Sequence, residues 1–102
     1  MNENQDKVRK FSEDNKLGMS IEHSFIDVSS ELGELAKEIL KMRLSDTKDI
    51  DSQRKIILEF GDVFYSLINL ANQMGIDLDR ALNFALEKYE DRIRESGSPG
   101  SQ

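Results

Sequence analysis

The sequence predicts an all-α protein with four helices in one bundle. Proline is absent before Pro99, and glycine is sparse, with six in 102 residues. Apolar residues recur every three or four positions, which is the period of an amphipathic helix, and no segment alternates apolar and polar residues convincingly. We therefore expect one helical domain at residues 1–95, followed by a flexible tail at 96–102.

The first two expected helices occupy the N-terminal half of the chain. The first covers about residues 3–16, and Gly18 suits its stop. The second covers about residues 20–43, and Ser20 is a suitable N-cap because its hydroxyl can accept a hydrogen bond from the first turn. The apolar stripe of this second helix consists of Ile21, Phe25, Val28, Leu32, Leu35 and Ile39.

Two further helices follow a polar connection at residues 45–51, which is rich in Asp, Ser and Thr. We expect the third helix at residues 52–74, with Gly75 as its C-terminal stop. The fourth runs from its N-cap, Asp77, to about residue 95. The third stripe consists of Ile56, Ile57, Phe60, Val63, Phe64, Leu67, Ala71 and Met74, and the fourth of Leu78, Leu82, Ala85, Tyr89 and Ile93.

Composition limits the function classes. The chain has 14 basic and 20 acidic side chains, so its net charge is 14 − 20 = −6, which disfavours nucleic-acid binding. It has no cysteine, which excludes disulfides, thiolate zinc sites and a thiol nucleophile. No apolar run is long enough to span a membrane, and the N-terminus is unlike a secretory signal, so we expect a cytoplasmic protein. A domain this small buries a modest core, which favours a homo-oligomer.

Two short segments, residues 31–34 and 59–62, nearly repeat each other, and each carries two acids three positions apart. On helical wheels, both pairs fall on the same rotational side of their apolar stripes, so antiparallel packing places all four on one side. The midpoint of 31 and 62 equals that of 34 and 59, namely 46.5, inside the expected connection. The sequence therefore predicts four carboxylates within about one helical turn, roughly 5 Å of height.

Four converging carboxylates repel one another unless a cation neutralises them. An all-oxygen ligand set suits Mg²⁺ or Mn²⁺, so these acids are candidate ligands for such an ion. The alternative is that they form solvated helix surface, since acids three apart are common on helices. Geometry from sequence leaves both interpretations open.

Gly33 and Gly61 lie inside the two acid-bearing helices, where glycine costs about 1 kcal/mol relative to alanine. Both fall on the flank away from the acids. We therefore expect close packing at these positions, against another helix or a partner subunit.

Basic side chains on the fourth helix are candidate ligands for a polyphosphate. Lys88 and Arg92 are four residues apart and share a face. Lys55, one turn before the second acidic pair, is placed to act similarly. The alternative for the fourth helix is a solvated basic edge that pairs with Glu87 or Asp91.

The single histidine, His23, lies off the apolar stripe, so we expect it at the surface. A di-iron bundle of the ferritin type needs Glu-x-x-His on two helices, which one histidine cannot supply. No glycine-rich loop follows a strand, which argues against a P-loop enzyme.

The ordered set of motifs resembles the MazG-like nucleotide pyrophosphohydrolases, of the all-α NTP pyrophosphatase superfamily. The acid pair at 31–34 is followed by 24 residues and then by the pair at 59–62. Residues 70–77, Leu-Ala-Asn-Gln-Met-Gly-Ile-Asp, also look like the family. Residues 88–92, Lys-Tyr-Glu-Asp-Arg, resemble its Lys-Phe-x-x-Arg motif. The similarity covers roughly residues 20–92.

The resemblance implies hydrolysis of a nucleoside triphosphate to the monophosphate and pyrophosphate, in the manner of nucleotide-pool house-cleaning. It implies a homodimer or homotetramer in which helices of two subunits build each site. The implied Mg²⁺ ligands are Glu31, Glu34, Glu59 and Asp62. The implied phosphate contacts are Lys55, Lys88 and Arg92. We assign Glu34 and Glu59 as the catalytic carboxylates, with Glu34 orienting or deprotonating the attacking water.

The nucleoside end of the substrate is less well defined. We expect the base to rest against apolar residues near the first helix or a subunit boundary, with Phe11 and Phe25 as candidates. Many family members have a ligand-binding asparagine two residues before the motif lysine, where this chain has Leu86. Leucine cannot hydrogen-bond to phosphate or sugar, and Asn83 lies on a different face. A non-catalytic helical interaction or regulatory module that retains the fold is therefore the alternative function.

Overall fold

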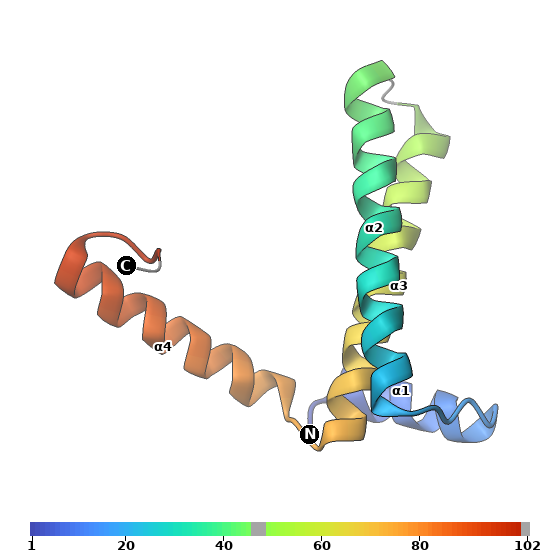
Figure 1. Cartoon of the computed structure of the whole chain (residues 1–102), viewed down its shortest axis with the longest axis horizontal. Helices are drawn as coiled ribbons and strands as arrows, with labels where there is room; N and C mark the ends of the chain where they lie inside the picture. The colour runs from blue at the N-terminus through green and yellow to red at the C-terminus, as the bar shows by residue number, and fades with distance from the viewer. Residues whose placement is uncertain (46–48, 101–102) are drawn as a thin grey trace.

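The computed structural model describes residues 1–45 and 49–100, and it contains four α-helices (Figure 1). These are α1 (Glu3–Asp14), α2 (Ile21–Ser45), α3 (Ile50–Met74) and α4 (Leu78–Ser96). The described residues contain no strand, so the predicted all-α class is confirmed. Residues 46–48, at the centre of the expected polar connection, lie outside the described residues. No helix in the described ranges has the length and apolar character needed to cross a membrane.

Side-chain caps set the first residues of the later helices. The Ser20 hydroxyl accepts a hydrogen bond from the His23 N–H at 3.1 Å, and the Asp77 carboxylate caps α4, as expected for both. α3 begins two residues before its expected start because Asp49 caps it, accepting from the Ser52 N–H at 2.7 Å. The backbone N–H groups of a first turn have no partner within their own helix, so each cap satisfies donors that would otherwise lack one.

The helix ends follow the same logic, with one correction. Gly75 ends α3 in the left-handed conformation (φ 69°), where glycine has no steric penalty, as expected. Gly18, in contrast, is not the stop of α1. That helix ends at Asp14, and Asn15 caps it by donating its side-chain amide to the Phe11 carbonyl at 2.9 Å. The turn then passes through Lys16, which has a positive φ of 55°.

α2 and α3 form a long antiparallel hairpin, and they lie side by side along most of their length (Figure 1). α1 packs against α3 near the end of the hairpin where α2 begins and α3 ends (Figure 1). The connection between two long helices is short, which favours this antiparallel pairing. The hairpin is the part of the fold that positions both acidic segments.

A buried glutamine joins three helices. Gln5 of α1 has an exposed fraction of 0 %, and its side-chain amide donates to the Asn72 side chain at 3.1 Å and to the Ile76 carbonyl at 2.7 Å. Its side-chain oxygen accepts from the Leu78 N–H at 2.8 Å. Gln5 therefore ties α1 to the end of α3 and to the start of α4.

A second polar contact closes the open end of the hairpin. The buried Ser24 hydroxyl of α2 donates to the Gln73 side-chain oxygen of α3 at 2.5 Å. The Gln73 amide in turn donates to the Met19 carbonyl at 2.6 Å. These bonds hold the start of α2 against the end of α3.

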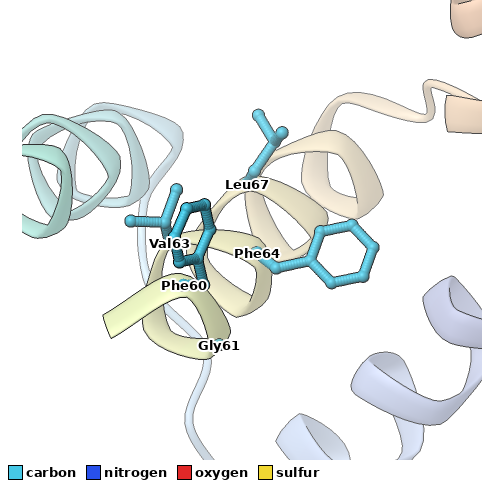
Figure 2. A pocket seen from close by; sticks show the side chains of 5 residues that line it. All are labelled: Phe60, Gly61, Val63, Phe64 and Leu67. Atoms are coloured by element: carbon cyan, nitrogen blue, oxygen red, sulfur yellow. The ribbon is translucent and has the colours of Figure 1, made fainter. Parts of the chain in front are cut away.

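The apolar core within one chain is small. Its buried apolar residues are Leu35, Ile68 and Ala71. Much of the expected apolar stripe of α3 is instead exposed, and it forms a shallow groove of about 360 Å³ lined by Phe60, Gly61, Val63, Phe64 and Leu67 (Figure 2). Exposed apolar patches of this kind mark interaction surfaces.

α4 stands away from the hairpin (Figure 1), and none of its residues is buried. Most of its large apolar side chains are exposed, including Leu82 and Phe84 at 57 % each. All four helices of the predicted class are present, but within the described chain α4 does not pack along the hairpin. The hydrophobic stripe of α4 is therefore left uncovered by the rest of the described residues.

The expected close packing at Gly33 and Gly61 does not occur within the described chain. A Cβ atom placed on either residue would have nothing within 4 Å apart from the adjacent residues and the helix's own backbone. The part of that expectation that involves a partner subunit remains a prediction.

We predict that Gln5→Met destabilises the protein, because methionine keeps the side-chain length but leaves the Ile76 carbonyl and the Leu78 N–H unpaired. Unpaired buried polar groups cost about 1–3 kcal/mol each, so the expected loss is about 2–4 kcal/mol. Urea unfolding at fixed protein concentration measures it. Gln53→Ala, at an exposed position of α3, is the control and should change stability by less than about 0.5 kcal/mol. Equal stability of the two variants would contradict this role of Gln5.

Candidate metal centre

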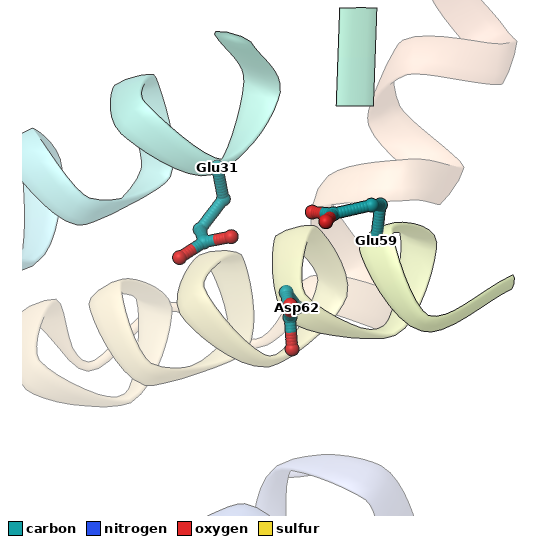
Figure 3. Close-up of side chains that lie close together, drawn as sticks. All are labelled: Glu31, Glu59 and Asp62. Atoms are coloured by element: carbon teal, nitrogen blue, oxygen red, sulfur yellow. The ribbon is translucent and has the colours of Figure 1, made fainter. Parts of the chain in front are cut away.

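Carboxylates from both helices of the hairpin converge near its middle. Glu31 of α2 and Glu59 and Asp62 of α3 each offer an oxygen, and these oxygens lie within 4.8 Å of one another (Figure 3). Glu31 and Glu59 are half-buried, whereas Asp62 is exposed. The antiparallel helices thus bring together acids that are about 30 residues apart in sequence.

The fourth predicted acid, Glu34, is not part of this group of three. It lies about one turn further along α2 and is exposed. Its negative charge nevertheless acts on Glu31. The structure therefore places Glu34 at the margin of the carboxylate cluster rather than within it.

The environment of Glu31 disfavours its charged form. Burial of the carboxyl group raises the pKa of Glu31, and the negative charges of Asp62, Glu59 and Glu34 raise it further, in that order. Each of these acids makes ionisation of Glu31 more costly because like charges repel. A bound cation would reverse this effect.

Asp27 is an additional acid beside the cluster, outside the two acidic motifs of the sequence. It also raises the pKa of Glu31, although less than the other acids do. Its position four residues before Glu31 on α2 was the available signal, since side chains at that spacing are neighbours. His23 lies 3.9 Å from the Asp27 carboxylate and is exposed, which agrees with its expected surface position.

The donor set suits a hard cation. Mg²⁺ binds oxygen at about 2.0–2.1 Å, so two ligands of one ion lie at most about 4.2 Å apart. The carboxylate oxygens lie up to 4.8 Å apart, so only small side-chain rotations are needed to bring them within that limit. The exposed flank at Asp62 leaves room for water and phosphate oxygens, which Mg²⁺ usually retains as ligands.

The predicted phosphate contacts are not brought to the acids within this chain. Lys88 and Arg92 lie on α4, which stands away from the hairpin (Figure 1). The Lys88 ammonium lies over the Tyr89 ring, 5.2 Å from its centre, and Arg92 donates to the Pro99 carbonyl at 3.3 Å. Lys55 is exposed on α3, about one turn before Glu59.

The two aromatic candidates for base contact differ in their surroundings. Phe11 of α1 makes an edge-to-face contact with Tyr65 of α3, with ring centres 6.0 Å apart. Phe25 is 60 % exposed on α2. Leu86 is also half exposed, on α4.

The fold and the cluster define a class: a helical protein that offers carboxylate ligands for a hard cation between two antiparallel helices. The family model of the MazG nucleotide pyrophosphohydrolase domain matches residues 20–96, which include α2, α3, α4 and all four predicted acids. The chain therefore belongs to the MazG family, whose members are generally metal-dependent. Membership supports nucleotide pyrophosphohydrolase activity in general.

A characterised relative gives a more distant comparison. The chain is 29 % identical over 58 residues to the nucleoside triphosphate pyrophosphohydrolase/pyrophosphatase MazG of Thermotoga maritima. This alignment covers 57 % of the chain but only 23 % of the Thermotoga protein, so the chain spans less than a quarter of that relative. No solved structure matches the chain.

We predict that Glu31→Gln raises the melting temperature of the metal-free protein at pH 7.5. Because the pKa of Glu31 is raised in the folded state, its ionisation opposes folding. That cost is absent below the ordinary glutamate pKa of about 4.3 and grows as pH rises through the folded value. The gain should therefore disappear near pH 4. Melting in EDTA at both pH values measures it.

The matched control for this prediction is Glu90→Gln, which removes an exposed carboxylate of α4 outside the cluster. It should leave the melting temperature nearly unchanged at both pH values. A lower melting temperature for Glu31→Gln at pH 7.5 than for this control would contradict the repulsion within the cluster.

Proposed function

We propose that this protein is a Mg²⁺-dependent nucleoside triphosphate pyrophosphohydrolase that converts (d)NTP to (d)NMP and pyrophosphate in the cytoplasmic nucleotide pool. The observation that carries the proposal is the group of three carboxylates within 4.8 Å, in a chain that belongs to the MazG family. The Thermotoga relative, a nucleoside triphosphate pyrophosphohydrolase/pyrophosphatase, supports the same reaction class.

In this proposal Glu31, Glu59 and Asp62 hold Mg²⁺ or Mn²⁺. When bound, the ion neutralises phosphate charge and lowers the pKa of a coordinated water. Glu59 contributes to catalysis as one of the three carboxylates that hold the ion. Glu34, which lies outside the three but close enough to act on Glu31, remains available to orient the attacking water and take its proton.

The proposed reaction is an in-line displacement at the α-phosphorus. The water oxygen forms a bond to the α-phosphorus, and its proton moves to the Glu34 carboxylate. The bond between the α-phosphorus and the α–β bridging oxygen breaks, and pyrophosphate leaves with the bonding electrons. Lys88 and Arg92, with Lys55, stabilise the negative charge of that leaving group electrostatically.

We propose that a second copy of the chain completes the site. Lys88 and Arg92 lie on a helix that does not pack along the hairpin within the described residues, and the exposed groove of α3 offers an apolar surface for such a helix (Figures 1 and 2). A homodimer, or a dimer of dimers, would cover both surfaces. Gly61 lines the groove, and its missing side chain lets a partner helix approach closely.

A specific observation supports the alternative, a non-catalytic helical module. Leu86 occupies a position that is often a ligand-binding asparagine in the family, and it is half exposed on α4. A chain that kept only the fold and the oligomer surface would tolerate this residue. Turnover distinguishes the two functions.

We predict that the protein releases pyrophosphate from at least one member of a dNTP panel in the presence of Mg²⁺. Glu59→Gln and Asp62→Asn should each lower kcat/KM about 100-fold or more, because each removes a negative oxygen ligand of the ion. Both should also abolish the rise in melting temperature that Mg²⁺ produces in the parent. Pyrophosphate release and melting curves measure these effects.

Glu34→Gln separates the proposed base from the ligands. It should lower kcat about 100-fold or more while the response of the melting temperature to Mg²⁺ remains. Glu87→Gln, on exposed α4 surface, is the control and should leave both unchanged. Absence of turnover with every nucleotide would exclude the proposed enzyme activity. Full activity in folded Glu59 and Asp62 variants would exclude these residues as the metal site.

We also predict complementation between two inactive variants. One carries Glu59→Gln and Asp62→Asn, and the other carries Lys88→Ala and Arg92→Ala. If the acidic and the basic residues of one site come from different subunits, each mixed dimer contains one site with all of these residues intact. Activity then returns after co-expression. If both come from the same chain, co-expression restores nothing, and shared sites would be excluded.

A further inference from the structure

A polar cleft of about 220 Å³ lies between α1, the connection to α2, and α3. It is separate from the carboxylate cluster. Its polar lining consists of Arg9, Ser12, Glu13, Asn69, Asn72 and Gln73. The cleft therefore offers a positive charge, a negative charge and neutral hydrogen-bonding groups. Its volume suits a small polar ring rather than a whole nucleotide.

Asn69 is the unusual residue of this cleft. Its side chain makes no hydrogen bond within residues 1–45 and 49–100, although only 7 % of the residue is exposed. The neighbouring amides are occupied: Asn72 bonds with Gln5, and Gln73 bonds with Ser24 and Met19.

The amide of Asn69 retains a narrow opening to solvent. Among the described residues, no fully buried side-chain nitrogen or oxygen lacks a partner. The Asn69 amide is therefore not sealed off, and the cleft is the space into which it opens. A buried amide without a protein partner is costly unless water or a ligand bonds to it.

The cleft is aligned with the carboxylate cluster along α3. Asn69 follows Asp62 by seven residues, which corresponds to about 10 Å of rise and about 20° of rotation. Ser66, which is buried, lies between them on the same face. A nucleotide with its phosphates at the cluster and its base in the cleft would run along this face.

We propose that this cleft binds the nucleobase of the substrate and that Asn69 is the specificity-determining residue, an inference that rests on the function proposed above. A primary amide presents a donor and an acceptor side by side, which matches a base edge with the complementary pair. Beside the cleft, Tyr65 lies one turn before Asn69 on α3 and makes an edge-to-face contact with Phe11 of α1.

Binding of unphosphorylated deoxynucleosides, measured by NMR titration in EDTA, tests the cleft without catalysis or metal. The parent should bind at least one of deoxyadenosine, deoxycytidine, deoxyguanosine and thymidine. Asn69→Leu should weaken that binding about tenfold or more, and Asn69→Asp, which replaces the donor by an acceptor, should change the preferred base. Gln53→Ala, at an exposed position of α3 outside the cleft, is the control and should bind like the parent.

Kinetics provide the second measurement. Asn69→Asp should raise KM for the preferred dNTP about tenfold while kcat stays within about threefold and the Mg²⁺ response of the melting temperature is retained. Asn69→Ser replaces the other variants if they fail to fold. If nucleosides bind in a manner that depends on Asn69 but no dNTP is hydrolysed, the proposed enzyme activity is contradicted while nucleobase binding in the cleft is supported. Failure of every nucleoside to bind, or unchanged base preference and KM in the Asn69 variants, would overturn the proposal that the cleft binds the nucleobase.

Discussion

The antiparallel register of α2 and α3 is the constraint on which the rest of this molecule depends. Shifting one helix by a single residue would rotate its side chains by about 100° and move them by about 1.5 Å. Glu31 would then no longer face Asp62, and the carboxylate cluster would open. The hydrogen bond between Ser24 and Gln73, together with the Gln73 bond to Met19, holds the open end of the hairpin in this register.

The distribution of polar and apolar residues on α3 explains how a small chain can carry a site. Ser66 and Asn69 are buried against the rest of the chain, whereas Phe60 and Phe64 are more than half exposed. The face that points into the chain is thus partly polar, and much of the hydrophobic surface points outward. Such a chain gains little stability from its own core, which agrees with the proposed assembly of two or more copies.

Local features were predictable from the sequence because they depend on residues near one another. Ser20 and Asp77 cap their helices through their side-chain oxygens, and Gly75 ends α3 because it lacks a Cβ atom and adopts a positive φ without strain. Asp49 was missed because it lies in a run of several residues that can all cap. The separation of α4 was not predictable, since an apolar stripe shows that a helix needs a cover but not which surface provides it.

The candidate site shows the same limit in more detail. Helical spacing alone put Glu31, Glu59 and Asp62 on one side of the hairpin, which is where the structure has them. Spacing could not separate Glu34 from these three, because side-chain direction near the margin of a cluster depends on packing. The hydrogen bonds of Gln5 and the burial of Asn69 beside a cleft were also beyond the sequence, since both depend on how helices far apart in the chain pack together.

Electrostatics relates the cluster to the other proposed parts of the site. The group of three carboxylates, with Glu34 and Asp27 nearby, places several negative charges around Glu31 and raises its pKa. A fold that only needed stability would replace one of these acids, because the repulsion opposes folding. Retaining them is consistent with a cation that neutralises the cluster, and with the cationic face of α4 serving phosphates held beside it. The same repulsion that destabilises the metal-free fold would thus favour binding of a cation and of a triphosphate held by that cation.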